Sequence, residues 1–162
     1  MTLQEIFDTA LNGIRKQGKP SYLFTNRPSF NPDKPDQNEW VPVCHYRLGD
    51  CKCAIGHLIT DEAYQKYYPL ENLPVPQARV LAALRESGLD ILDGTIHYKS
   101  VLFLTSLQAA HDIPIANATR DKHGYTTHIL DLVKYFAFFE LEMMKLANEY
   151  NLQYTDKDVS ET

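Results

Sequence analysis

The residues best suited to chemistry lie in one short stretch, where five thiol or imidazole side chains fall within fourteen positions. They are Cys44, His45, Cys51, Cys53 and His57. Thiolate and imidazole are ligands that zinc prefers, and a thiol beside an imidazole can act as a nucleophile. Structural zinc sites usually contain close pairs such as Cys-x2-Cys, and no such pair occurs here. The stretch therefore suggests a metal or thiol site without matching a standard motif.

His111 and Asp112 form a second candidate group, at the end of a helix predicted over residues 100–112. His111 follows Leu107 by four positions, which places it on the apolar face of that helix. From there it could meet the cysteine stretch, as a base for a thiol or as a metal ligand. A simpler interpretation also stands: a histidine of the core, with cysteines that are small buried fillers.

The element expected to carry the cysteines is a β-hairpin at residues 40–55. Residues 40–47 are rich in β-formers, 48–50 have turn composition, and 51–55 can return as the second strand. Side-chain alternation would then bring Cys44 near Cys51 or Cys53. The hairpin must fold against the helix of His111 for a composite site to exist.

Two site hypotheses depend on that arrangement. One is a metal site with zinc as the cofactor, whose ligands would be Cys44, Cys53, His57 and His111. The other is a thiol-dependent hydrolase or transferase, whose catalytic residues would be Cys53, His111 and Asp112. No signature of a cysteine hydrolase flanks the cysteines, and no phosphate-binding glycine loop, nucleophile elbow or His-Glu-x-x-His motif occurs. Neither catalysis nor a metal is the leading interpretation.

A binding protein is the leading interpretation, because aromatic and proline-rich segments surround the hairpin. Amphipathic aromatic side chains are enriched where proteins bind partners. The candidate ligand- or partner-binding residues are Trp40, Tyr46, Arg47, His57 and Tyr64. The partner would be a protein or a small-molecule ligand, with no cofactor required.

Composition limits the class of protein further. The 162 residues fit one domain, expected over 1–152, with a frayed polar tail at 153–162 and a long proline-rich loop at 25–39. A net charge of −5 argues against general binding of nucleic acids or anionic membranes. Three cysteines, an odd number, favour a reducing cytoplasm. The oligomeric state stays open.

The predicted fold is α+β and predominantly α-helical, with four to five helices packed around a small antiparallel β-hairpin. Thr2 and Glu5 form a capping box that starts a helix over 3–17. Further helices are predicted from Asp61, over 76–87, over 100–112 before Pro114, and over 127–151. The last helix carries a continuous apolar stripe from Ile129 to Tyr150.

Two segments carry a resemblance to other proteins. The first is Cys44-His45-Tyr46-Arg47 with the following Lys52-Cys53-Ala54-Ile55-Gly56-His57-Leu58-Ile59-Thr60-Asp61-Glu62-Ala63-Tyr64, and the second is Leu107-Gln108-Ala109-Ala110-His111-Asp112. Together they resemble a group of small uncharacterised proteins found in bacteriophages, prophages and bacteria. The resemblance implies that the two segments belong to one unit, and it favours a phage or prophage origin. A binding protein of that origin would act on a host protein or a small ligand. The resemblance implies no particular chemistry.

Overall fold

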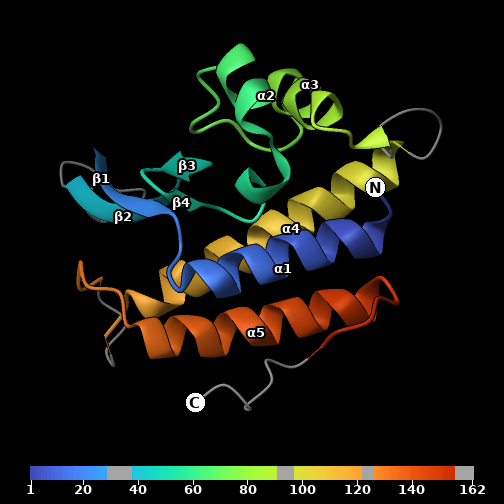
Figure 1. Cartoon of the computed structure of the whole chain (residues 1–162). Coiled ribbons are helices and arrows are strands. Elements are labelled where there is room, and N and C mark those ends of the chain that lie inside the picture. The colour runs from blue at the N-terminus through green and yellow to red at the C-terminus, as the bar shows by residue number, and fades with distance from the viewer. Residues whose placement is uncertain (29–37, 91–96, 122–125, 156–162) are drawn as a thin grey trace.

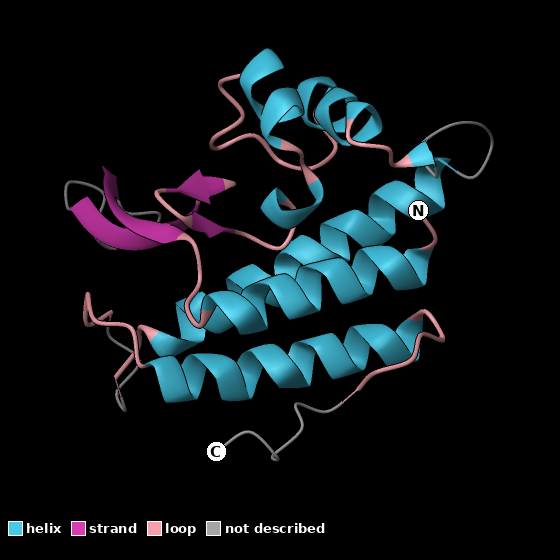
Figure 2. Cartoon of the chain, in the orientation of Figure 1, coloured by secondary structure: helices cyan, strands magenta, loops and turns pink. Residues whose placement is uncertain are grey.

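The structure, a computed structural model, describes residues 1–28, 38–90, 97–121 and 126–155 (Figure 1). It confirms the predicted class, an α+β fold that is mainly helical (Figure 2). The described elements are α1 Leu3–Gln17, β1 Tyr22–Pro28, β2 Asn38–Cys44, β3 Arg47–Leu48, β4 Cys51–Lys52, the 3-10 helix η1 Gly56–Leu58, α2 Asp61–Lys66, α3 Ala78–Glu86, α4 His97–Ala118 and α5 Leu132–Glu149. Within these residues, no helix is long and apolar enough to cross a membrane.

Helices α1, α4 and α5 run alongside one another and form the base of the fold, with the strands over one end and α2 and α3 above (Figure 1). Helix α1 begins at the predicted capping box of Thr2 and Glu5. Its buried face supplies Ile6, Phe7 and Ile14, each fully buried in the core. That face follows the 3.6-residue period, so this helix was predictable from the sequence.

The sheet differs from the expected hairpin. Strand β2 pairs antiparallel with β1, in a register that sets Tyr22 opposite Cys44 and Asn26 opposite Trp40. Residues 25–28 and 38–39, expected in the proline-rich loop, are therefore strand residues, while 29–37 lie outside the described residues. The prediction failed because Tyr22–Thr25 is β-prone but was read with the prolines that follow it.

The predicted return strand is reduced to a short ladder, in which β3 pairs with β4 through Arg47–Lys52 and Leu48–Cys51. The chain then turns sharply into η1. A Cβ atom on Gly56 would lie 2.0 Å from the backbone oxygen of Tyr46, so only glycine allows this close approach. The approach holds Cys53 beside the end of β2. The thiols of Cys44 and Cys53 therefore meet although the predicted pairing of residues 40–47 with 51–55 is reduced to the β3–β4 ladder.

Helix α4 is longer than predicted, because it continues through Pro114 to Ala118. A proline inside a helix removes one backbone hydrogen bond and costs roughly 3 kcal/mol. Burial of Pro114, Ile115 and Ala118 offsets that cost. The expectation that the helix ends before Pro114 was wrong, because residues 114–118 are helical.

Helix α5 is shorter than predicted, and residues 127–131 precede it. Its buried residues are Tyr135, Phe139, Met143, Leu146 and Ala147. The first part of the predicted stripe is instead exposed, since Ile129 and Val133 are 73% and 83% accessible. The predicted apolar stripe is therefore divided into an exposed part that includes Ile129 and Val133 and a buried part that runs from Tyr135 to Ala147.

The chain after α5 returns along the helical base. Gln153 exchanges two hydrogen bonds with the side chain of Gln4, at 2.8 and 3.0 Å. Arg15 donates to the backbone oxygen of Thr155 at 2.9 Å. Residues 153–155 are therefore held against α1 rather than frayed, and the rest of the expected tail, 156–162, lies outside the described residues.

Candidate functional site

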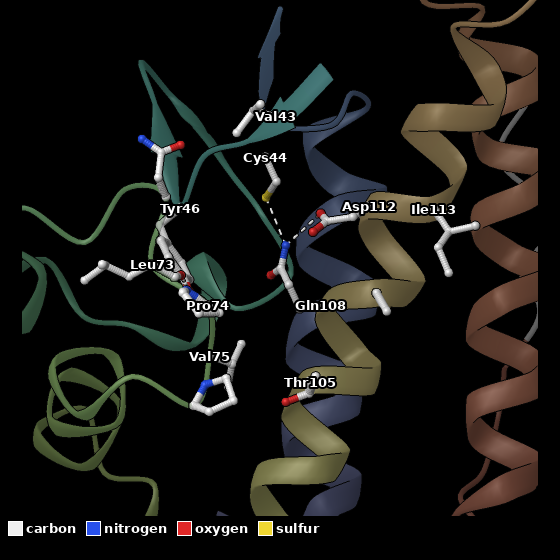
Figure 3. A pocket seen from close by; sticks show the side chains of 13 residues that line it. Val43, Cys44, Tyr46, Leu73, Pro74, Val75, Thr105, Gln108, Asp112 and Ile113 are labelled. Atoms are coloured by element: carbon white, nitrogen blue, oxygen red, sulfur yellow. Dashed lines mark hydrogen bonds between the residues drawn. The ribbon is translucent and has the colours of Figure 1, made fainter. Parts of the chain in front are cut away.

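A pocket of about 460 Å³ opens between the end of β2, residues 72–76 and helix α4 (Figure 3). Apolar side chains form most of its walls, with Val43 on one side, Leu73 and Val75 on another, and Ile113 on α4. The remaining lining residues are Cys44, Tyr46, Asn72, Pro74, Pro76, Thr105, Gln108, Ala109 and Asp112. No lysine or arginine is among these described lining residues, so the only formal charge in the pocket wall is that of Asp112.

Gln108 organises the polar floor of this pocket. Its Nε2 group donates to Cys44 Sγ at 2.9 Å and to Asp112 Oδ1 at 2.7 Å, as Figure 3 shows. Its Oε1 atom accepts from the Cys53 thiol at 3.3 Å. Cys53 Sγ accepts in turn from the backbone N–H of Gly56 at 3.3 Å. The side-chain amide of Gln108 thus links Cys44 and Cys53 to Asp112 on α4.

His111 lies behind this floor and is fully buried. Its Nδ1 atom is 2.8 Å from Asp112 Oδ1 and 3.8 Å from Cys44 Sγ. The three donor atoms of Cys44, His111 and Asp112 all lie within 4.8 Å of one another. The cysteine segment and the imidazole therefore share one interior. This group differs from the predicted metal set, because Asp112 joins it and neither Cys53 nor His57 belongs to it.

The same geometry gives little support to a thiol nucleophile. Hydrogen bonding with Cys53, followed by burial, raises the pKa of the Cys44 thiol far above its usual range. In a thiol–imidazole pair, one ring nitrogen takes the thiol proton while the other is held by an acid. Here Nδ1 of His111 faces both Cys44 and Asp112, and Nε2 is buried without a partner among the described residues. Cys53 is fully buried.

His57 lies in a different pocket, which α1 and β4 line with Lys16, Gln17 and Lys52 among others. Its ring packs on Gly13, where a Cβ atom would come within 2.6 Å of two ring atoms. Burial, and then the nearby charge of Lys52, lower the pKa of His57 to about 4. The imidazole is thus neutral near neutral pH, and it does not reach the floor of the first pocket.

Three other predicted binding residues form a network inside the protein. The Tyr46 N–H donates to Glu71 at 2.8 Å, and its hydroxyl donates to the Leu73 backbone oxygen at 2.7 Å. The Tyr64 hydroxyl donates to the same Glu71 carboxylate. Arg47 lies over the Tyr64 ring at 4.6 Å and pairs with Asp61. Of these three residues, only Tyr46 lines the first pocket.

Trp40 and Cys51 are also separate from the pocket floor. Trp40, on β2, is 44% exposed, and its ring meets that of His128 in an edge-on contact. Cys51 is buried on β4 and lines the pocket of His57. The five predicted binding residues therefore do not gather in one place.

Two important residues escaped the sequence reasoning. Gln108 lies four positions before Asp112, the spacing at which helical side chains interact, so this pair could have been found. Glu71 accepts hydrogen bonds from Tyr46, Arg47 and Tyr64, and it lies in a proline-rich linker without any pattern. Nothing in its local sequence could have indicated that role.

Comparisons with known proteins do not assign this chain to a family. No protein-family model matches the chain, and neither do the curated proteins or the solved structures that were searched.

Proposed function

We propose that this chain is a small accessory binding protein, and that its ligand occupies the pocket between β2, residues 72–76 and α4. The observation that carries the proposal is the lining: apolar walls around a floor with one carboxylate and no described cation. Ligand pockets in proteins typically combine apolar walls with a few fixed polar groups. A volume of about 460 Å³ lies within the range of such pockets.

The polar floor determines the chemistry of the ligand. Asp112 accepts from His111 and Gln108, yet its side chain is 41% exposed and retains acceptor capacity toward the pocket. Gln108 and His111 hold the carboxylate in place. A ligand with an apolar body and an ammonium or N–H end would satisfy both the walls and the floor, since hydrogen bonds between charged groups are the strong ones.

This proposal has more support than the thiol-dependent hydrolase or transferase. An apolar pocket with a fixed carboxylate needs no activated thiolate, whereas the alternative needs Cys53 or Cys44 to lose a proton. The cytoplasmic location and the phage or prophage origin remain parts of the proposal. They rest on net charge, cysteine content and sequence resemblance.

The test compares two probes of similar shape, benzylamine and benzyl alcohol, by calorimetry on the full chain with a metal chelator present. Benzylamine, cationic near neutral pH, should bind at least about tenfold more tightly than the alcohol. Asp112→Asn should remove that difference. Asp50→Asn, which changes an exposed carboxylate on the β3–β4 turn, should preserve it. Equal binding of the two probes, or a preference that survives Asp112→Asn, would overturn the proposal.

A further inference from the structure

We infer that Cys44, His111 and Asp112 form a binding site for a divalent transition-metal ion, with zinc the ion that best fits the donor set. Asp112 belongs to both sites, but the inference does not rest on the proposed ligand, because metal binding is measured without any organic ligand and depends on Cys44 and His111 as donors. Sulfur, imidazole nitrogen and carboxylate oxygen are the three donor types found at zinc sites in proteins.

The distances are close to those that a tetrahedral ion imposes. Zinc–ligand bonds of about 2.0–2.3 Å place neighbouring donor atoms roughly 3.3–3.6 Å apart. Cys44 Sγ and His111 Nδ1 are 3.8 Å apart, and His111 Nδ1 and Asp112 Oδ1 are 2.8 Å apart. All three donor atoms lie within 4.8 Å of one another, so an ion would have to widen the Nδ1–Oδ1 distance and shorten the longer ones.

The backbone holds the donors on stable elements. His111 and Asp112 are neighbours on α4, four turns into a helix packed on α5, and Cys44 is the last residue of β2. Sites built on helices and strands keep their ligands in position better than sites on loops. Gln108 adds an outer contact, since its amide donates to both Cys44 and Asp112.

The local charge also favours a cation. Asp112 is the only side chain with a formal charge among the described residues of the pocket wall, and the Cys44 and Cys53 thiols lie beside it around Gln108. An incoming dication binds the Cys44 sulfur as thiolate, and the thiol proton passes to solvent. His111 then binds through Nδ1 and carries its proton on Nε2. The pocket leaves the fourth coordination position open to water or to a ligand.

The experiment is a titration of the reduced, chelator-treated full chain with Co²⁺, which reports tetrahedral sulfur ligation by its optical spectrum. We expect one ion per chain, intense visible bands of tetrahedral cobalt and a thiolate-to-cobalt charge-transfer band in the ultraviolet. Zinc should displace the cobalt and remove these bands. Cys44→Ser should abolish the charge-transfer band and weaken binding by at least about 100-fold.

Cys51→Ser is the matched control, because it changes a buried cysteine outside the site and should leave both bands intact. His111→Gln is the second variant, to be used if Cys44→Ser fails to fold as judged by circular dichroism. It should abolish tetrahedral cobalt binding. The inference is overturned if the wild-type chain shows no tetrahedral cobalt spectrum, or if a folded Cys44→Ser or His111→Gln chain keeps it. These outcomes are independent of benzylamine binding, which is measured without metal.

Discussion

At the scale of single residues, the buried His111 and the half-buried His57 have opposite settings. His111 is fully buried beside a carboxylate, with its Nδ1 atom 2.8 Å from Asp112. His57 is packed on α1 and is close to the positive charge of Lys52. The first histidine therefore lies beside an anionic group, whereas protonation of the second is opposed. The local sequence does not distinguish the two imidazoles, since Gly56 precedes His57 and Ala110 precedes His111, and neither small residue indicates the surroundings of the ring.

His57 should make stability dependent on pH. Its pKa of about 4 in the folded protein lies below the value of 6.5 for an unperturbed histidine, so the unfolded chain binds more protons between these values. Stability is complete above the unfolded pKa and is lost as the pH falls toward the folded pKa. Because solvent partly screens this half-buried group, we expect a loss of about 1–2 kcal/mol from its protonation.

The measurement is urea unfolding of the wild type and His57→Gln at about pH 7 and about pH 4.5. Glutamine stays neutral at both values, so the variant should lose about 1–2 kcal/mol less stability on acidification than the wild type. Carboxylates titrate alike in the two chains and cancel. Identical pH dependence in both chains would contradict the assignment.

At the scale of elements, packing of η1 on α1 explains a glycine inside a helix. Gly13 lies in the middle of α1, where glycine costs about 1 kcal/mol relative to alanine. A Cβ atom there would come within 2.6 Å of the His57 ring. The close contact between η1 and α1 therefore requires glycine at position 13, although glycine has a lower helix propensity than alanine.

A double-mutant cycle tests this contact. In the wild type, Gly13→Ala should destabilise by about 1–2 kcal/mol, because overpacking outweighs the gain in helix propensity. In a His57→Ala background, the same alanine should stabilise by up to about 1 kcal/mol. Unfolding in urea gives the four free energies. A gain of the same size in both backgrounds would show that the ring does not restrict position 13.

The elements also show how far the sequence could be read. Helix α1 and the start of α2 were predictable, because capping residues and apolar period agree locally. The end of α4 was predicted wrongly because of Pro114. A proline favours the end of a helix locally, and the sequence shows only that local preference, but tertiary burial outweighed it. The partner of β2 was also missed, because strand pairing is non-local. A meeting of the cysteine stretch with His111 was one of two alternatives that the sequence left open, and the pairing of residues 40–47 with 51–55, expected to bring Cys44 near Cys51 or Cys53, is reduced to the β3–β4 ladder.

At the scale of the whole molecule, a charged cluster joins the two ends of the chain. The Arg15 guanidinium on α1 donates twice to Glu140 on α5, at 2.9 and 2.7 Å. The Tyr154 hydroxyl, in the segment after α5, also donates to Glu140. Burial, and then the hydrogen bond to Glu140, raise the pKa of Tyr154 to about 12. This cluster fixes α1, α5 and the returning segment below the helix that carries His111 and Asp112.

Breaking the cluster should therefore weaken the whole fold. Glu140→Gln leaves the Arg15 guanidinium, which is only 10% exposed, without its carboxylate. We expect a loss of about 1.5–3 kcal/mol in the free energy of unfolding, since a largely buried charge is left partly unpaired. The matched control is Glu142→Gln, which removes a neighbouring carboxylate paired with the exposed Lys145. That change should cost less than about 0.5 kcal/mol. Equal losses in the two variants, measured by urea unfolding, would mean that the Arg15–Glu140 pair contributes no more than a surface ion pair and that apolar packing alone holds α1 to α5.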